Sequence, residues 1–170
     1  MSKAQGAQPK TNALRILEGF GIAHRVIAYE VDESDLSAES VAAKVGLPSE
    51  RVFKTLALRG EKGGVFLACV PGDSELDLKK AARAAGEKSV EMLPLKDLQP
   101  VTGYLRGGCS PLGAKRKFPV YVDETAQLFG EISVSAGLRG LQVLLAPDDL
   151  VRAATEQPGG SSVARYADLI

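Results

Sequence analysis

Apolar residues recur along this chain in two patterns, one with the period of a helix and one with the composition or alternation of a strand. The helical pattern begins after the capping residues Thr11, Ser37 and Asp77, and again at Pro94 and Pro147. The strand pattern is present at 25–30, 52–58, 65–70, 89–92, 101–105, 118–122, 131–134 and 141–145. The sequence therefore predicts a domain that contains both helices and strands.

The order of these elements indicates the fold class. Residues 60–64 have the composition of a turn, so the strands on either side are expected to pair as an antiparallel hairpin. The strands do not alternate strictly with helices, which argues against a doubly wound parallel fold. We therefore expect an α+β fold, in which a single domain has a mixed, largely antiparallel sheet and flanking helices. The expected division is a flexible arm at 1–10, the domain at 11–157 and a C-terminal tail at 158–170, whose structure the sequence does not indicate.

Composition excludes several classes of function. The 170 residues suit one domain, and 45% hydrophobic and 25% charged residues are typical of a globular protein. Because 21 Lys+Arg balance 21 Asp+Glu, no broad basic surface for DNA is expected. His24, Cys69 and Cys109 are too few for a four-ligand zinc site, and a Ser-His-Asp triad would have to use His24 itself. We therefore expect no metal and no cofactor.

Cysteine usage and hydropathy bear on the compartment. Two cysteines in a chain of this length do not form a disulfide framework, which favours a reducing compartment. The longest apolar runs, such as 65–70, are far shorter than the roughly 20 residues of a membrane span. The segment 1–6 is polar and lacks the apolar core of a secretory signal. A cytoplasmic protein with no membrane partner is expected.

The stretch 106–117 follows neither period and forms a long, basic, glycine-rich loop. Its consecutive glycines, Gly107 and Gly108, would let backbone N–H groups approach and bind a negative oxygen. The loop does not complete a Walker motif, because Ala114 follows Gly113 where lysine is required. An anion or oxyanion cradle and a simple surface turn remain equally consistent with this composition.

Lys54 is the second candidate for chemistry. Strand alternation places it on the same face as Val52, Leu56 and Leu58, which are all apolar. A lysine on an apolar face is costly to bury unless it meets an anion or hydrogen-bond acceptors. The alternative is a lysine on an edge strand whose ammonium group reaches water.

Cys109 is a candidate nucleophile, since Arg106 and Lys115 would lower the pKa of its thiol. The sequence offers no general base for this thiol other than His24. Cys69, between apolar neighbours, is expected in the core, and His24 is expected to be structural. The cations of the loop form either a solvated face or a contact with phosphates.

Three motifs, in this order along the chain, resemble the YbaK/EbsC family, whose members are freestanding relatives of the editing domain of bacterial prolyl-tRNA synthetases. They are Val52–Leu56, Leu76–Ala82 and Val101–Gly113. The resemblance extends from about Thr11 to Leu150, and the most similar subgroup is the Cys-tRNA(Pro) deacylases. It implies a sheet curved as a half-barrel, an editing domain at 11–157, an aminoacyl-tRNA substrate and prolyl-tRNA synthetase as a partner.

The resemblance also implies roles for individual residues. Lys54 matches the essential lysine of the family. The positions that it implies around the aminoacyl group are Tyr29, Gly107, Gly108, Ser110 and Ser135. Gln142 stands where relatives often carry aspartate, and it carries no negative charge. Cys109 occupies a variable position of the loop motif, which weakens the thiolate hypothesis further.

The implied reaction needs few protein groups. Cleavage of an aminoacyl ester requires oxyanion stabilisation, which backbone amides supply, and a nucleophile, which in the cysteine-specific subgroup is the thiol of the substrate. The implied substrate is Cys-tRNA(Pro), with Cys-tRNA(Cys) as a further one. A deacylase for mischarged Ala or Ser, and a noncatalytic tRNA- or synthetase-binding module, remain alternatives. The expected tRNA contacts are Lys79, Lys80, Arg106, Lys115, Arg116 and Lys117. With balanced charge, tRNA binding by the chain alone is expected to be weak.

Overall fold

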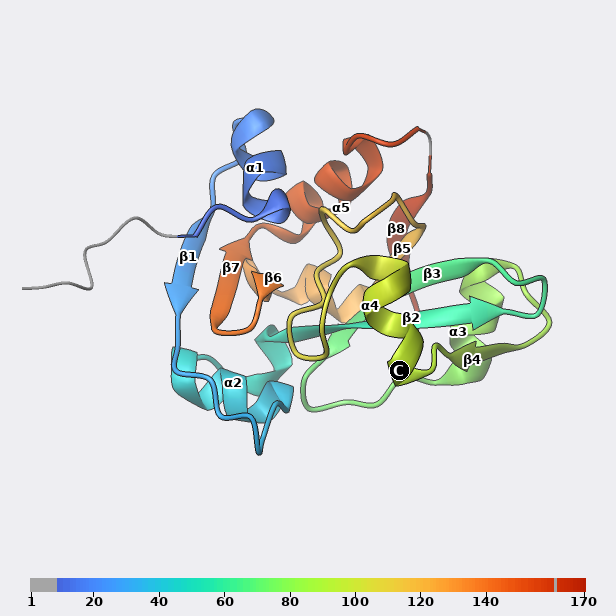
Figure 1. The fold of residues 1–170 in the computed structure, drawn as a ribbon, viewed down its shortest axis with the longest axis horizontal. Coiled ribbons are helices and arrows are strands. Elements are labelled where there is room, and N and C mark those ends of the chain that lie inside the picture. Colours follow the sequence, from blue (N-terminus) through green and yellow to red (C-terminus); the bar gives the residue numbers. More distant parts are fainter. Residues whose placement is uncertain (1–8, 161) are drawn as a thin grey trace, which may run out of the picture.

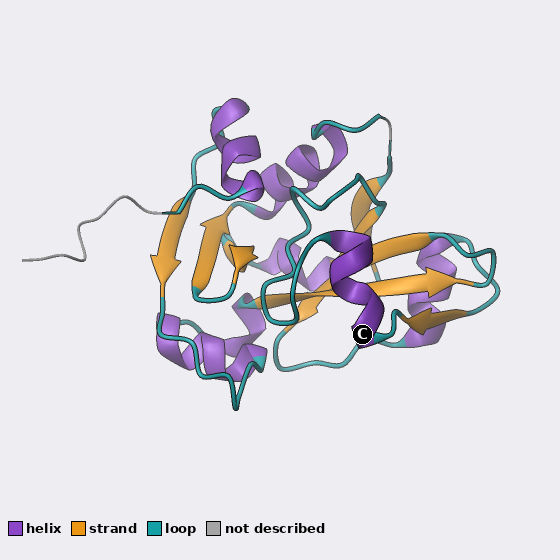
Figure 2. Ribbon diagram, in the orientation of Figure 1, coloured by secondary structure: helices purple, strands orange, loops and turns teal. Residues whose placement is uncertain are grey.

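The computed structural model describes residues 9–160 and 162–170, so the predicted N-terminal arm lies almost wholly outside the described residues. The expected α+β domain is confirmed, with helices packed around two sheets (Figure 2). The helices are α1 (Asn12–Gly19), α2 (Ala38–Val45), α3 (Leu78–Ala85), α4 (Leu95–Thr102) and α5 (Pro147–Glu156), and the short 3-10 helices are η2 (Ser49–Arg51) and η3 (Glu124–Leu128). In these described parts, no helix has the length and apolar character needed to cross a membrane.

The strands form two sheets rather than the one that the sequence suggested. The smaller sheet has the order β1-β7-β6 and is antiparallel, whereas the larger has the order β4-β2-β3-β5-β8 and is mixed. Their bounds are β1 (Arg25–Ala28), β2 (Phe53–Gly60), β3 (Val65–Pro71), β4 (Val90–Met92), β5 (Val120–Asp123), β6 (Ile132–Leu138), β7 (Leu141–Leu145) and β8 (Ala164–Ala167). One parallel bridge, between Val52 and Ser133, connects the two sheets. The predicted β2-β3 hairpin is confirmed (Figure 1), and the half-barrel curvature stays a prediction.

Helix starts follow the predicted caps closely. Thr11, Ser37 and Asp77 each accept hydrogen bonds from backbone N–H groups in the first turn of α1, α2 and α3 respectively. These bonds satisfy donors that a helix cannot pair internally. Gly46 and Gly86 end α2 and α3 in the left-handed conformation that glycine adopts readily.

The expected strand or extended segment at 101–105 is wrong at its first two residues, and no strand forms there. Val101 and Thr102 form the end of α4, which continues past Pro100. The Thr102 hydroxyl donates a 2.6 Å hydrogen bond to the Leu98 carbonyl oxygen one turn earlier, which gives this buried hydroxyl a partner within the helix. The β-branched pair has strand composition, but its helical position is decided by this local bonding and by Gly103, which ends the helix at a positive φ of 85°.

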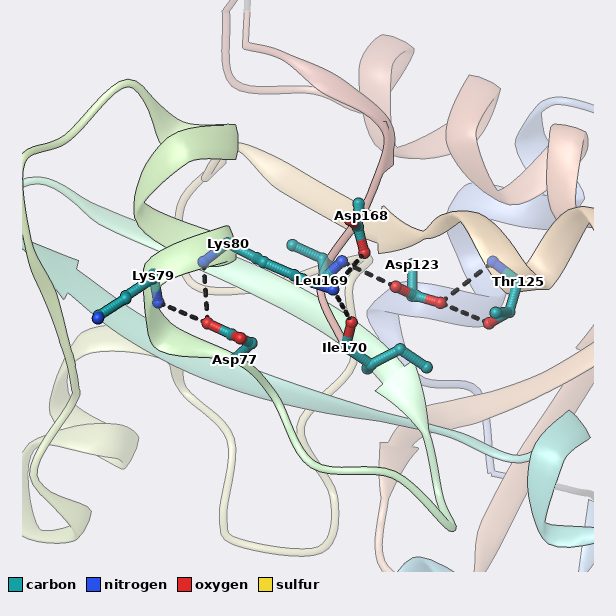
Figure 3. Close-up of polar contacts among 8 residues, drawn as sticks. All are labelled: Asp77, Lys79, Lys80, Asp123, Thr125, Asp168, Leu169 and Ile170. Carbon is teal, nitrogen blue, oxygen red and sulfur yellow. Dashed lines mark hydrogen bonds and ion pairs between the residues drawn. The ribbon is translucent and has the colours of Figure 1, made fainter.

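The C-terminal segment, for which the sequence indicates no structure, contributes β8 to the larger sheet. This strand pairs in parallel with β5. Beyond it, the buried Leu169 donates its N–H to the Asp123 carboxylate at 2.9 Å (Figure 3). The other carboxylate oxygen of Asp123 accepts bonds from the N–H and the hydroxyl of Thr125. Residues 164–170 are thus tied to the end of β5.

The main core lies where the two sheets and two helices meet. It includes Leu17 of α1, Phe53 of β2, Val143 of β7 and Leu150 of α5, all of them buried. A second, smaller cluster lies beneath α3. Because residues from both sheets share the main core, the start of β2 is held against β6.

Candidate active site

A cavity of about 530 Å³ follows the first half of β2. Its walls come from α2, from the β4-α4 segment, from the loop after α4 and from β6 and β7. Figure 1 shows α4 in front of β2, with α2 near the start of that strand. Cavities of this size hold ligands that are larger than a single amino acid.

Lys54 is one of the residues that line this cavity. Its side chain is half-buried on β2, opposite the buried Val70 of β3. Within residues 9–160 and 162–170, Lys54 has no ion pair with a carboxylate and no side-chain hydrogen bond. The ammonium group is therefore available to a ligand, as the first of the two interpretations of the sequence requires.

Ser135 and Gln142 form a polar wall opposite β2. They face each other in the β6-β7 pairing, at the edge of a β-bulge that begins after Ser135. The hydroxyl oxygen of Ser135 accepts a 3.1 Å bond from the Gly137 N–H, and the hydroxyl of Ser133 donates a 2.7 Å bond to Oε1 of Gln142. In the described structure, neither the Ser135 proton nor the Gln142 amide nitrogen has another partner. Both groups can donate into the cavity.

The glycine-rich loop contributes only part of its predicted residues to the cavity wall. Arg106 and Gly107 line the cavity, and Gly107 has a φ of +85°. Gly108 packs against the β6-β7 turn. A Cβ atom added at Gly108 would lie 3.1 Å from the backbone nitrogen of Arg139. Ser110 is buried, and its hydroxyl oxygen accepts the Leu112 N–H at 3.2 Å. Gly108 and Ser110 thus shape the loop from behind.

Tyr29 is not among the residues that line the cavity. It follows β1, and its N–H donates to the Gly140 carbonyl oxygen at 2.9 Å. Its ring packs on a small cluster that includes Val41 and Val52, and both of these residues do line the cavity. Tyr29 therefore supports the wall from outside.

Cys109 lines the cavity, but the prediction that Arg106 and Lys115 lower the pKa of its thiol is wrong. Burial raises that pKa from 9.0 to about 12, and the neighbouring Cys69 acts in the same direction. Desolvation disfavours the charged thiolate and therefore raises the pKa of the thiol. Cys69 is buried in the core, as expected, and His24 lies outside the cavity with Nδ1 2.7 Å from the Ile22 carbonyl oxygen.

Most of the predicted tRNA-binding cations lie elsewhere or are engaged within the fold. The ammonium of Lys80 pairs with Asp168 at 3.1 Å and also bonds the Ile170 carbonyl oxygen (Figure 3), while Lys79 lies exposed on α3. Lys115 donates to the Pro100 carbonyl oxygen. Lys117 donates to the carbonyl oxygens of Thr155 and Gly160, and Arg116 lies over the Phe118 ring. Of the six predicted cations, only Arg106 lines the cavity.

Two groups of residues that the sequence did not single out lie at the cavity or beside its wall. Met92, Leu95 and Leu98 of the β4-α4 segment form an apolar wall. Arg139, in the β6-β7 turn, donates from Nε to the Arg106 carbonyl oxygen at 2.6 Å. The three apolar residues could have been noticed as large side chains around the expected start of a helix. The position of Arg139 depends on a contact between distant segments, which the sequence does not indicate.

Comparison with known proteins identifies the family. Residues 32–153 match the family model of the aminoacyl-tRNA editing domain. This chain belongs to that family. It is 51% identical over 144 residues to "Putative Cys-tRNA(Pro)/Cys-tRNA(Cys) deacylase EbsC" of Enterococcus faecalis, a match that covers 85% of this chain and 88% of EbsC. YwhH, an uncharacterized protein of Bacillus subtilis, is 31% identical over 71% of this chain and 76% of its own length.

Larger enzymes and solved structures agree with this membership. A proline–tRNA ligase of Thermosipho africanus is 31% identical over 47% of this chain, which spans only 14% of the ligase. A crystal structure of a "putative trans-editing enzyme for prolyl tRNA synthetase" superimposes with a TM-score of 0.75 and 28% identity, over 95% of this chain and 98% of that chain. The hypothetical protein APE2540 shares the fold, with a TM-score of 0.79 at 22% identity over 91% of this chain and 96% of its own.

Proposed function

We propose that this chain is a trans-editing aminoacyl-tRNA deacylase that clears Cys-tRNA(Pro), with Cys-tRNA(Cys) as a second substrate. Membership of the editing family supports the cleavage of an aminoacyl ester. The 51% identity to EbsC, over most of both chains, supports cysteine as the amino acid removed. The cavity along β2 is the proposed site of this reaction.

The observation that carries the proposal is the convergence of free hydrogen-bond donors on one cavity. The Lys54 ammonium, the Ser135 hydroxyl and the Gln142 amide all line it. Such donors stabilise the oxyanion that develops when an ester carbonyl is attacked. The lining contains no histidine, and its cysteine thiol is held protonated by burial. This favours a nucleophile that belongs to the substrate.

The substrate thiol supplies that nucleophile in the proposed mechanism. Its sulfur attacks the ester carbonyl carbon, and the tetrahedral intermediate then expels the 3′-oxygen of the tRNA. The proton lost by the thiol goes to that oxygen, so the products are tRNA with a free hydroxyl and a four-membered cysteine thiolactone, which water opens to cysteine. Because the enzyme holds the substrate thiol and the ester carbonyl together in a reactive orientation, no protein nucleophile is needed. In the hydrolytic variant of the mechanism, water attacks the ester carbonyl directly and no thiolactone forms.

Lys54 is the proposed catalytic residue. Its ammonium binds the ester carbonyl oxygen or an oxygen of the terminal phosphate, while the backbone of Gly107 holds the ester and Gly108 supports the loop from behind. Ser135 is proposed to contact the aminoacyl group directly. Tyr29 and Ser110 are proposed to act through the walls that they support, because neither is among the lining residues.

The test is a deacylation panel with Cys-, Ala-, Ser- and Pro-tRNA(Pro). We expect Cys-tRNA(Pro) to be cleaved with the highest kcat/KM, and S-methylcysteinyl-tRNA(Pro), which lacks the free thiol, to be cleaved poorly. Preferred cleavage of the Ala or Ser substrate would assign a different editing specificity. Binding of tRNA without cleavage of any ester would show a noncatalytic binding module instead.

Prolyl-tRNA synthetase is the proposed partner. The family resemblance to editing domains of proline–tRNA ligases supports this link. The balanced net charge and the engaged lysines limit the number of phosphates that the chain alone can neutralise. We expect the synthetase to lower the KM for Cys-tRNA(Pro), which steady-state deacylation with and without it measures.

A further inference from the structure

Tyr104 lies between two walls of the cavity without lining it. It follows Gly103, which ends α4, and its N–H donates a 3.1 Å hydrogen bond to the hydroxyl oxygen of Thr102. The side chain is half-buried and packs against the main core. Because Tyr104 is not among the residues that line the cavity, its effect on a reaction there has to act through its neighbours.

On one side, Tyr104 is bonded to the glycine-rich loop. Its hydroxyl donates a 2.6 Å hydrogen bond to the carbonyl oxygen of Leu112, which is a fully buried residue. Burial raises the pKa of this hydroxyl above its ordinary value of 10.0, so the group stays protonated and remains a donor at neutral pH. The bond fixes the ring relative to the loop that contributes Gly107 and Cys109 to the cavity wall.

On the other side, the Tyr104 ring packs against the β-bulge of β6. A Cβ atom added at Gly137, whose φ is +97°, would lie 3.1 Å from Cε1 and 3.3 Å from Oη of Tyr104. The ring therefore lies directly on the Gly137 backbone, in a space that the absence of a side chain leaves open. The carbonyl oxygen of the preceding Ala136 accepts a 2.5 Å bond from the Thr11 hydroxyl at the start of α1. Two segments that are distant in sequence thus hold the bulge.

The bulge presents the Ser135 hydroxyl to the cavity. Ser135 lines the cavity, and the register of β6 against β7 shifts between Ser135 and Leu138. The Gly137 N–H donates a 3.1 Å bond to the Ser135 hydroxyl oxygen. Because this bond occupies one lone pair of the oxygen, the place of Gly137 decides how the hydroxyl is held and leaves its proton for a ligand.

We propose that Tyr104 is a positioning residue for the Ser135 hydroxyl, because its ring holds Gly137 in the place from which the N–H bonds that hydroxyl. This role rests on the proposed function, in which Ser135 contacts the aminoacyl group. Without the ring, Gly137 gains room, and the Ser135 oxygen is held less closely in the orientation that directs its proton to the ester. A displacement of about 1 Å at a reacting group can lower a rate about 100-fold.

A double-mutant cycle on kcat for Cys-tRNA(Pro) tests this role. Tyr104→Leu is expected to lower kcat about 10-fold in the wild-type background but less than about 2-fold in the Ser135→Ala background, since the hydroxyl that Tyr104 positions is then absent. Tyr104→Phe keeps the ring and loses only the bond to Leu112, so its expected loss is about 3-fold, again only when Ser135 is present. This second variant carries the test if Tyr104→Leu does not fold.

Tyr166→Leu is the matched control. Tyr166 is also half-buried, and its hydroxyl donates a 2.7 Å bond to Asp148, but it lies on β8 outside the cavity. We expect Tyr166→Leu to lower the midpoint of urea unfolding while kcat for Cys-tRNA(Pro) stays within about 2-fold of the wild type. The control thus separates a loss of packing from a loss of position in the cavity.

Two results would overturn the inference. The same fold-change from Tyr104→Leu in both backgrounds, including no change in either, would show that Tyr104 does not act through Ser135. A wild-type kcat in Ser135→Ala would leave no hydroxyl for Tyr104 to position. Failure of the proposed function looks different, because the wild-type protein would then not cleave Cys-tRNA(Pro) at all.

Discussion

The hydroxyl of Ser133 donates a 2.7 Å hydrogen bond to Oε1 of Gln142, and both residues are buried. This bond occupies the carbonyl side of the amide, so the NH₂ side is left toward the cavity that Gln142 lines. A neutral, oriented donor thus stands where the family resemblance places an aspartate in many relatives. In the proposed mechanism, this amide donor takes the place of a negative charge at that position.

Removal of the Ser133 hydroxyl should therefore impair both stability and activity. In Ser133→Ala the buried Oε1 loses its donor, which costs about 1–3 kcal/mol in the free energy of unfolding. The freed amide should also lower kcat/KM for Cys-tRNA(Pro). In the double variant Ser133→Ala with Gln142→Leu, stability should recover because both polar partners are gone, while activity should stay low. Urea unfolding and deacylation rates measure the two effects, with Ser89→Ala as a control. Full activity in the double variant would remove Gln142 from the site.

Substitution of Lys54 should lower activity with little effect on the free energy of unfolding. Its ammonium has no partner within the described chain, so Lys54→Ala should change the free energy of unfolding by less than about 0.5 kcal/mol. Loss of a donor to the developing oxyanion should lower kcat by about 100-fold or more. Lys96→Ala, at an exposed position of α4, is the matched control. Activity close to that of the wild type in folded Lys54→Ala would refute the assigned role.

The two buried thiols should make the protein sensitive to alkali. Burial raises the pKa of both Cys69 and Cys109 from 9.0 to about 12, so the folded state binds these protons more tightly than the unfolded chain. Their contribution to stability is fully present below pH 9 and is lost as the pH rises toward 12. Urea midpoints between pH 8 and 11 measure this loss, which Cys69→Ala should reduce.

Cys109→Ser should retain deacylase activity, since the thiol is protonated at neutral pH and is not the nucleophile. Iodoacetamide should label Cys109 slowly in the folded protein, with no inflection in rate between pH 7 and 9. Cys109→Ala serves as the second variant if the buried hydroxyl of serine impairs folding. Complete loss of activity in both folded variants would restore the thiolate mechanism.

Local signals in the sequence predicted much of the fold because they depend on neighbouring residues. The caps Thr11, Ser37 and Asp77 and the β2-β3 hairpin follow from backbone bonding within a few positions. The end of α4 was misjudged because Val101 and Thr102 have strand composition but are bonded within the helix. Residue propensities alone do not show that a β-branched pair is bonded into the end of a helix.

In the candidate site too, local features were predictable from the sequence and contacts between distant residues were not. Lys54 was singled out by a local conflict between a charge and an apolar strand face, and it does line the cavity. The engagement of Lys80 with Asp168, and the approach of Arg139 to Arg106, join residues far apart in the chain. Charge clusters in the sequence therefore did not indicate which cations are bonded within the fold, or that Arg139 lies beside Arg106.

Asp123 provides the last prediction, because it ties the C-terminal segment to the sheet (Figure 3). Its two carboxylate oxygens accept bonds from Leu169 and Thr125, and the residue is fully buried. Asp123→Ala should lower the free energy of unfolding by about 3 kcal/mol or more, since a hydrogen bond to a buried charge contributes about 1.5–3 kcal/mol. Lys80→Ala, which breaks a partly exposed ion pair with Asp168, should cost at most about 1 kcal/mol and leave KM for Cys-tRNA(Pro) unchanged. Urea unfolding and steady-state kinetics test both variants. A raised KM in Lys80→Ala without loss of stability would return this lysine to the tRNA-binding surface.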